Sequence, residues 1–153
     1  MKLIQGVQTK ALRVMPDERG RVFEMLRRDE PLFKKFGQVY CTTVNAGVVK
    51  GWHYHKKQCD HFVCVSGMIK LVLYDDRADS PTKGTINEFF IGIHNPLLVQ
   101  VPPYVWHGFK GLSVHEAVVI NIPTEPYHHK RPDEYRADPH GGQIPYEWHK
   151  VDR

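Results

Sequence analysis

The stretch that decides the fold runs from residue 53 to residue 67 and reads His53-Tyr-His-Lys-Lys-Gln-Cys-Asp-His-Phe-Val-Cys-Val-Ser-Gly67. His53 and His55 are two residues apart, and the two-residue period of a strand places both imidazoles on one face. Asp60 begins an apolar run that ends at the turn pair Ser66-Gly67. The pattern predicts two neighbouring strands of a β-barrel, with the histidines facing the interior.

Further strand-forming segments extend from this stretch in both directions. They are short, rich in β-branched and aromatic residues, and separated by turn residues such as Asn95-Pro96. The predicted strands are residues 21–26, 38–44, 61–65, 68–74, 86–91, 97–101 and 114–122. This spacing, without long helical periodicity, predicts an all-β barrel or sandwich. The one helix that we expect is short and covers residues 29–36.

The composition changes after Pro123. The remaining residues include several prolines and aromatic residues: Pro126, Tyr127, Pro132, Tyr135, Pro139, Pro145, Tyr146 and Trp148. Because proline cannot donate to a sheet ladder, we expect an irregular C-terminal tail that wraps the barrel. A chain of 153 residues is near the commonest size of one domain, so we predict a single domain over residues 1–153.

Composition and charge exclude several classes of protein. An apolar fraction of 41% and a charged fraction of 25% are typical of a globular protein. The N-terminus lacks the apolar run of a signal peptide, and no stretch has the ~20 apolar residues that span a bilayer, so we expect a cytoplasmic protein without membrane association. Three cysteines without paired spacing suit a reducing compartment. The net charge of +4 is spread along the chain, which argues against a nucleic-acid partner and suits a small anionic substrate.

A third histidine, His107, follows Val101-Pro-Pro-Tyr-Val-Trp106 on a later segment. With His53, His55 and Asp60 it resembles the two signature motifs of the cupin superfamily, H-x-H with a following acid and P-x-G-x-x-H. The resemblance implies a cupin jelly-roll β-barrel. Three imidazoles and a carboxylate are ligands that can bind an ion of Fe, Mn, Ni or Zn. The same groups can instead share hydrogen bonds in a metal-free pocket, and both hypotheses stay open.

Four ordered segments resemble the family of dTDP-4-dehydrorhamnose 3,5-epimerases, over about residues 17–148. They are residues 17–24 (the family's D-x-R-G-x-F-x-E), 49–54 (L-R-G-L-H-Y), 75–84 (D-x-R-x-x-S-P-T-x-G) and 101–109 (I-P-x-G-x-x-H-G-F). Residues 124–127 and 144–148 resemble the closing segments of the family. Four motifs in order over a hundred residues are far more specific than H-x-H alone.

The resemblance implies a nucleotide-sugar isomerase that epimerises a dTDP-4-keto-6-deoxyhexose at the 3- and/or 5-position by proton abstraction next to the ketone. His53 would be the base, since its pKa lies near neutrality, and Tyr127 the acid. The implied substrate-binding residues are Arg19, Glu24, Gln38, Lys50 and His107. In the family the first two come from the partner subunit, so a homodimer is expected. This chemistry needs no cofactor.

Three departures from the family bear on catalysis or on substrate binding. Asp60 stands where the family places a lysine suited to stabilising an enolate, so a cation is replaced by an anion. The C-terminal segment whose aspartate orients the catalytic histidine is absent, and Asp152 is the candidate substitute. Lys50 also replaces an arginine, which keeps the charge but loses the forked geometry.

Two other functions therefore stay as alternatives. The first is a metal-dependent cupin enzyme, a dioxygenase or a sugar ketoisomerase, with His53, His55, Asp60 and His107 as ligands of a divalent ion. The second is a non-catalytic sugar-binding cupin, which would bind a nucleotide sugar without exchanging its protons. Retention of the Arg19 segment favours the epimerase, and the intact H-x-H with its acid favours the metal enzyme.

Overall fold

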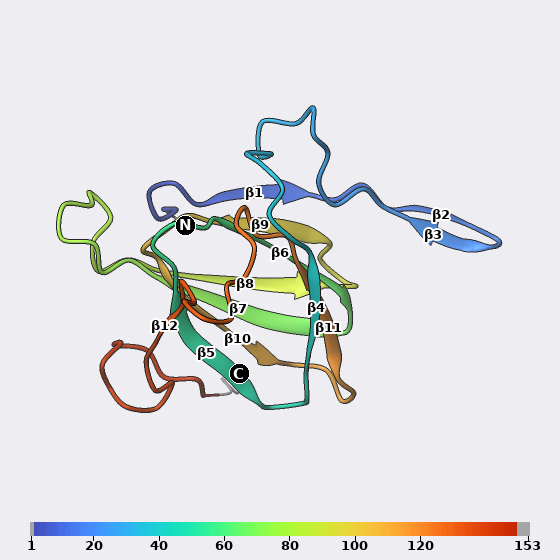
Figure 1. The fold of residues 1–153 in the computed structure, drawn as a ribbon. Helices are drawn as coiled ribbons and strands as arrows, with labels where there is room; N and C mark the ends of the chain where they lie inside the picture. The colour runs from blue at the N-terminus through green and yellow to red at the C-terminus, as the bar shows by residue number, and fades with distance from the viewer. Residues whose placement is uncertain (1, 150–153) are drawn as a thin grey trace.

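The computed structural model describes residues 2–149 and consists of two five-stranded antiparallel sheets and a separate two-stranded hairpin (Figure 1). The first sheet has the order β1 (Gln8–Ala11), β9 (Leu97–Val101), β6 (Asp60–Ser66), β11 (Ala117–Asn121) and β4 (Tyr40–Val44). The second has the order β12 (Tyr135–Arg136), β5 (Val49–Tyr54), β10 (Trp106–Gly111), β7 (Met68–Tyr74) and β8 (Ile86–Gly92). The hairpin joins β2 (Met15–Asp17) to β3 (Gly20–Val22). The predicted all-β jelly roll is confirmed.

The main core lies between the two large sheets. On β7, Ile69, Leu71 and Leu73 point into this core and are fully buried. They alternate with Val72, which is equally buried but packs on the opposite face of the sheet. A strand buried on both faces reads as a continuous apolar run, and each such side chain contributes roughly 1.5–3 kcal/mol of burial free energy.

The C-terminal segment covers the outer face of the second sheet. Trp148 packs on Trp52 of β5 with ring centroids 4.8 Å apart, and both side chains are buried. On the way there the chain forms β12, a two-residue edge strand in which Arg136 pairs with His53 and Tyr135 with Tyr54. This pairing brings residues 133–136 to the edge of β5 that carries the histidines.

The segment between β3 and β4 differs from our prediction. The strand predicted over residues 21–26 ends at Val22, because Phe23 and Leu26 pack on the outer face of the first sheet instead of joining a ladder. The helix predicted over residues 29–36 is wrong: no helix occurs in residues 2–149, and none therefore crosses a membrane. The carbonyl of Leu32 instead accepts a hydrogen bond from the side chain of Gln100 at 2.8 Å.

Two glycines bring β5 and β10 unusually close. A Cβ atom added to Gly51 would lie 2.9 Å from Cα of Gly108, and one added to Gly108 would lie 3.1 Å from Cα of Gly51. Real Cβ atoms rarely approach a backbone atom so closely, so only glycine fits both positions without a backbone shift. The contact lies next to the cross-strand pair of His53 and His107.

Candidate active site

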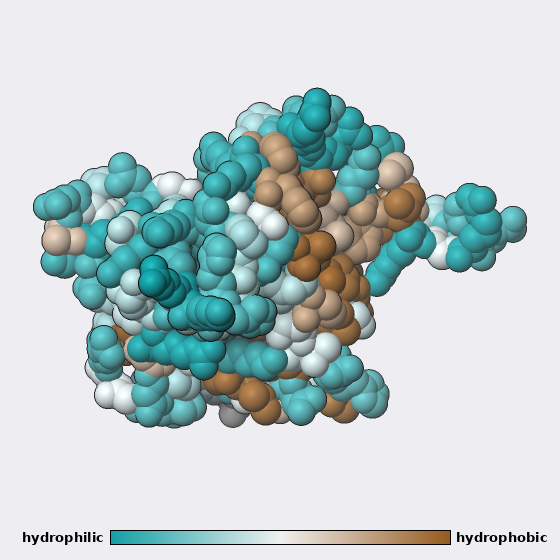
Figure 2. Space-filling view, in the orientation of Figure 1, coloured by the Kyte–Doolittle hydropathy of each residue, from teal (hydrophilic) through white to brown (hydrophobic). Residues whose placement is uncertain are grey.

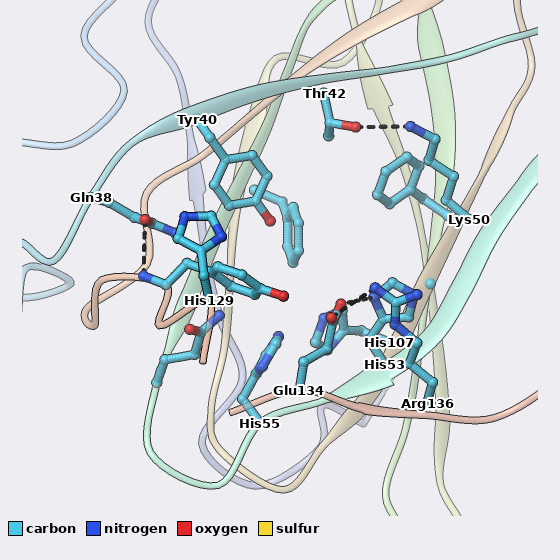
Figure 3. Close-up of a pocket in the computed structure, with 15 residues that line it drawn as sticks. Gln38, Tyr40, Thr42, Lys50, His53, His55, His107, His129, Glu134 and Arg136 are labelled. Atoms are coloured by element: carbon cyan, nitrogen blue, oxygen red, sulfur yellow. Dashed lines mark hydrogen bonds and ion pairs between the residues drawn. The ribbon is translucent and has the colours of Figure 1, made fainter. Parts of the chain in front are cut away.

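The histidines line a cavity of about 520 Å³, a volume typical of small-molecule sites. Its walls come from β4, β5, β6, β10 and the segment after β11 (Figure 3). The lining residues are Gln38, Tyr40, Thr42, Lys50, His53, His55, Gln58, Phe62, His107, Gly108, Phe109, Tyr127, His129, Glu134 and Arg136. The walls therefore combine imidazoles, phenols, one carboxylate and two cations.

His53 is paired with a carboxylate. Its Nδ1 lies 3.1 Å from Oε1 of Glu134, whose side chain is largely buried and also accepts a hydrogen bond from Arg136 at 2.8 Å (Figure 3). Burial lowers the pKa of His53 below its ordinary value, while the negative charge of Glu134 acts in the opposite direction. A neutral ring that donates Nδ1–H to the carboxylate keeps a free electron pair on Nε2, as a general base requires.

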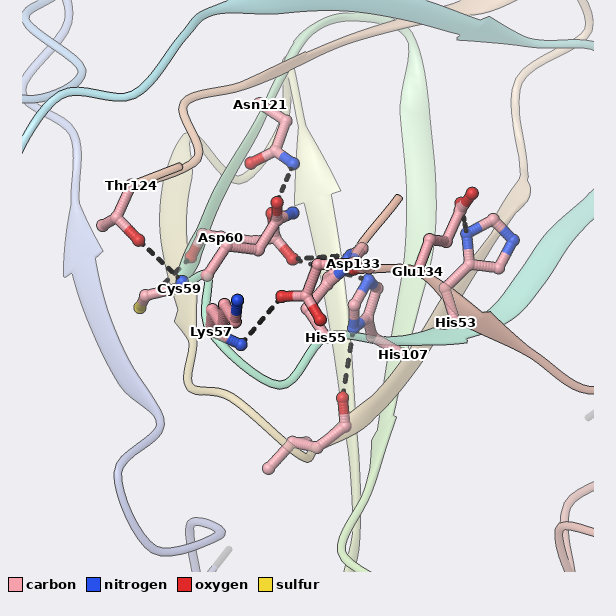
Figure 4. Close-up of polar contacts among 12 residues, drawn as sticks. His53, His55, Lys57, Cys59, Asp60, His107, Asn121, Thr124, Asp133 and Glu134 are labelled. Carbon is pink, nitrogen blue, oxygen red and sulfur yellow. Dashed lines mark hydrogen bonds and ion pairs between the residues drawn. The ribbon is translucent and has the colours of Figure 1, made fainter. Parts of the chain in front are cut away.

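A second group of side chains lies beside His53. Oδ2 of Asp60 is 3.4 Å from Nε2 of His55 and 3.6 Å from Nε2 of His107 (Figure 4). These three residues offer ligand atoms within 4.8 Å of one another and could hold a metal ion. His53 is not part of this group, because its imidazole faces Glu134 instead. Three of the four residues of the alternative metal site therefore lie together, and His53 lies apart from them.

Asp60 is buried and firmly held. Its Oδ1 accepts hydrogen bonds from Gln58 at 2.8 Å and from Asn121 at 2.9 Å. Burial lowers the pKa of His107 to about 4, and its Nδ1 contacts the carbonyl of Val105 at 3.2 Å. The carboxylate of Asp60 therefore does not line the pocket itself, and the side chains of His55, Gln58 and His107 lie between it and the cavity.

Three of the predicted substrate-binding residues line the pocket with the catalytic candidates. The backbone N–H of Tyr127 donates to Oε1 of Gln38 at 3.0 Å, which fixes the start of the tail against β4. Nζ of Lys50 donates to Oγ1 of Thr42 at 3.0 Å. Lys50 and Arg136 are the two cations of the pocket wall.

Arg19 and Glu24 lie outside the pocket of their own chain. Arg19 is at the tip of the β2–β3 hairpin, which projects away from the two sheets in Figure 1. Its side chain is 84% exposed and pairs with Asp17 at 2.6 Å, whereas Glu24 pairs with Arg27 at 2.9 Å. Within one chain, these two residues do not meet the histidines.

The S-P-T motif, Ser80-Pro-Thr82, has a structural role in the loop between β7 and β8. Asp75 is fully buried and accepts hydrogen bonds from Arg77 at 2.8 Å, Ser80 at 2.5 Å and Thr82 at 2.6 Å. Burial raises the pKa of Asp75, but these hydrogen bonds outweigh it and hold the pKa well below its usual range. The motif closes the loop on a buried carboxylate and lies away from the pocket lining.

Sequence reasoning missed several pocket residues. Glu134, Arg136 and His129 fall in the proline-rich tail, where no motif marks them. Tyr40 stands within a predicted strand without any motif around it. The two-residue alternation of side chains along β4 places Tyr40 and Thr42 on the same face as Gln38. This alternation was the one signal in the sequence that could have identified Tyr40 as a pocket residue. Asp152, our candidate for orienting His53, lies outside the described residues.

Comparison with known proteins assigns the family. The family model described as dTDP-4-dehydrorhamnose 3,5-epimerase matches residues 2–152. A probable low-salt glycan biosynthesis epimerase of Haloferax volcanii is 39% identical over 149 residues, which cover 96% of this chain and 91% of that protein.

Two solved structures are similar in fold. A dTDP sugar isomerase from Desulfovibrio desulfuricans G20 has a TM-score of 0.91 at 35% identity and covers 97% of this chain and 94% of its own. A dTDP-6-deoxy-D-glucose-3,5-epimerase from Legionella pneumophila Philadelphia 1, in complex with dTDP-4-keto-L-rhamnose, has a TM-score of 0.83 at 25% identity, over 96% of this chain and 80% of its own. The chain therefore belongs to the dTDP-4-dehydrorhamnose 3,5-epimerase family of enzymes.

Proposed function

We propose that the chain, as a single domain over residues 1–153, is a nucleotide-sugar epimerase that acts on a dTDP-4-keto-6-deoxyhexose at C3, C5 or both. The observation that carries the proposal is the pairing of His53 with Glu134 at 3.1 Å on the wall of a cavity large enough for a sugar. The Legionella relative holds dTDP-4-keto-L-rhamnose, a sugar of this class joined to a nucleoside diphosphate, which supports the same class of substrate here.

His53 acts as the base in this reaction. Its Nε2 takes the proton from the carbon next to the ketone, the C–H electron pair forms the C=C bond of an enolate, and the carbonyl π pair moves onto oxygen. Tyr127 returns a proton from the opposite face of the ring, which inverts the carbon. Glu134 holds the ring in the Nδ1–H tautomer and stabilises the imidazolium that forms, as a carboxylate does in other histidine-based sites.

The nucleotide diphosphate binds at the cationic side of the pocket. Lys50 lies on β5 and lines the same cavity as His53, and Gln38 and His107 complete the proposed substrate contacts. A lysine binds phosphate as a point charge, without the forked geometry of arginine. The pocket therefore favours an anionic substrate over a neutral sugar.

The functional unit that we propose is a homodimer in which the hairpin of one chain completes the site of the other. The support is the projecting position of β2–β3, which leaves Arg19 unable to serve its own pocket. Figure 2 shows apolar surface over β4 and β11 and near the base of this hairpin. Val22, Phe36 and Val39 are 59%, 63% and 55% exposed, and apolar side chains that gather in a surface patch are typical of an interface.

The proposed reaction needs no cofactor, because it moves protons without changing any oxidation state. The metal-dependent alternative is not favoured, since it required His53 as a ligand and the imidazole pairs with Glu134. We also propose that the enzyme works in the cytoplasm. The three cysteines, Cys41, Cys59 and Cys64, are free thiols, as in most proteins of a reducing compartment.

The test is proton exchange. The purified protein is incubated with dTDP-4-keto-6-deoxyglucose in D2O, and the sugar C3 and C5 protons are followed by NMR. We expect exchange at C3, C5 or both, and its loss in His53→Ala by a factor of about 10²–10⁴. A protein that binds the nucleotide sugar but exchanges neither proton would be a non-catalytic sugar-binding protein, and the proposal would be wrong.

A further inference from the structure

A buried amide, Asn121, connects the pocket to the carboxylate behind it. Oδ1 of Asn121 accepts the backbone N–H of His61 at 2.9 Å. Nδ2 of Asn121 donates to Oδ1 of Asp60 and to the hydroxyl oxygen of Tyr40, each at 2.9 Å. Because a backbone N–H can only donate, it fixes which end of the amide is oxygen. The two hydrogens of Nδ2 are then both committed, one to Asp60 and one to Tyr40.

The orientation of Asn121 decides what Tyr40 offers to the pocket. The hydroxyl oxygen of Tyr40 accepts from Nδ2, so its own hydrogen cannot point at that amide. Tyr40 lines the cavity, and Figure 3 shows its hydroxyl directed into the cavity, toward the side that carries His53, His55 and His107. The phenol therefore presents a hydrogen-bond donor to whatever occupies the pocket.

The hydroxyl of Tyr40 keeps its proton at neutral pH. Burial raises the pKa of Tyr40 to about 12, and the negative charge of Asp60 acts in the same direction. A neutral phenol of this kind is a donor that does not itself lose a proton. Such donors stabilise an oxyanion that forms beside them.

The neighbouring imidazoles cannot take this role in their neutral form. Nδ1 of His55 contacts the backbone carbonyl of Asp133, and Nδ1 of His107 contacts that of Val105. A carbonyl oxygen only accepts, so each ring carries a hydrogen on Nδ1 that is already committed. Both Nε2 atoms face Oδ2 of Asp60, at 3.4 Å and 3.6 Å. Any hydrogen on these Nε2 atoms is therefore directed at Asp60, and an enolate oxygen needs a donor from another residue.

We propose that the hydroxyl of Tyr40 is the oxyanion donor of the reaction, a role that rests on the proposed epimerase function. When His53 takes the α-proton, negative charge moves onto the sugar O4. The O–H of Tyr40 donates a hydrogen bond to this oxygen and keeps its proton. Tyr127 then returns a proton to carbon, the electrons move back into the carbonyl, and the hydrogen bond from Tyr40 weakens again. The two phenols of the pocket thus have different tasks.

The experiment compares Tyr40→Phe with Tyr127→Phe and the wild-type protein, by proton exchange in D2O and by dTDP binding. Tyr40→Phe should lower the exchange rate about 10²–10³-fold, because removal of one oxyanion donor has an effect of this size. Its dissociation constant for dTDP should stay within about twofold of wild type. Tyr127→Phe should still exchange the substrate proton but form little of the inverted product, which separates the acid from the oxyanion donor.

Tyr40→3-fluorotyrosine is the control that links the loss to the hydroxyl itself, while unchanged dTDP binding in Tyr40→Phe reports an intact fold. The fluorotyrosine variant keeps the hydroxyl and its hydrogen bond, so exchange should return to within about threefold of wild type. An exchange rate in Tyr40→Phe within about threefold of wild type would overturn the inference while leaving the epimerase function intact. Absence of exchange in the wild-type protein itself would overturn the epimerase function, and the inference with it.

Discussion

Nδ1 of His53 and Oε1 of Glu134 lie 3.1 Å apart, although they come from opposite halves of the chain. The two-residue strand β12 is the cause, since it pairs Arg136 with His53 along the edge of β5. Glu134 directly precedes this strand, so the pairing holds its carboxylate next to the imidazole of His53.

Replacement of this acid tests the pairing. Glu134→Gln keeps the size of the side chain but removes its charge, so the imidazolium that forms during catalysis loses its stabilising partner. We expect kcat for proton exchange to fall about 10²-fold while KM changes little. Glu147→Gln, in an exposed part of the tail, is the matched control and should behave as wild type. An unchanged kcat in Glu134→Gln would contradict the role of Glu134.

Mixing two inactive variants tests the shared site. Arg19→Ala and His53→Ala carry defects that a homodimer would place in different sites, so half of randomly mixed dimers have one intact site. We expect an equal mixture to regain about a quarter of the wild-type activity. A mixture of Glu134→Gln with His53→Ala is the control and should regain none, because both defects affect the pocket of their own chain. No recovery in the first mixture would argue against exchanged hairpins.

Removal of metal separates the epimerase from the metal enzyme. The base that we propose, His53, lies outside the group formed by His55, Asp60 and His107. Overnight dialysis against a chelator should therefore leave the rate of proton exchange within about twofold of the untreated rate. Metal content is measured on the same samples. Loss of exchange that returns with added Zn²⁺ or Fe²⁺ would instead support the metal-dependent alternative.

The buried Asp75 makes stability depend on acid pH. Its folded-state pKa is held below the unfolded value of about 3.9, so its contribution is present above that pH and is lost as the pH falls toward the folded-state pKa. Asp75→Asn should lower the free energy of unfolding at pH 7 by about 3 kcal/mol, because it leaves Arg77 without its buried partner. It should also flatten the decline of stability between about pH 5 and pH 2.

Urea denaturation at several pH values measures both effects. Asp79→Asn, an exposed change in the same loop, is the control and should shift the unfolding free energy by less than about 0.5 kcal/mol. Equal acid dependence in Asp75→Asn and wild type would show that another group controls acid unfolding.

The sequence predicts the strands of the sheets better than the irregular segments that pack on the outer faces of the sheets. Strands such as residues 68–74 and 97–101 were predicted with their observed bounds, because alternation and turn residues are local signals. Residues 23–26 were predicted wrongly as strand, and residues 29–36 wrongly as helix. Their apolar side chains pack on the outer face of a sheet whose strands are distant in the sequence. A contact of this kind cannot be predicted from the local sequence pattern.

The site shows the same division. His53, His55 and His107 follow from spacing and motif, and all three line the pocket. Glu134 could not be predicted, since its place depends on a two-residue strand inside a proline-rich tail. The task of Tyr40 depends on the orientation of Asn121, which only the hydrogen bond from His61 reveals.

The close contact of Gly51 with Gly108 limits how this pocket can be redesigned. With no room for a side chain at either position, the spacing of β5 and β10 is fixed by backbone atoms alone. His53 and His107, which pair across the same two strands, are held by that spacing. A library intended to change the preferred sugar should therefore keep both glycines and vary rim positions such as Thr42 and His129, where new side chains alter the shape of the cavity and leave the reacting groups in register.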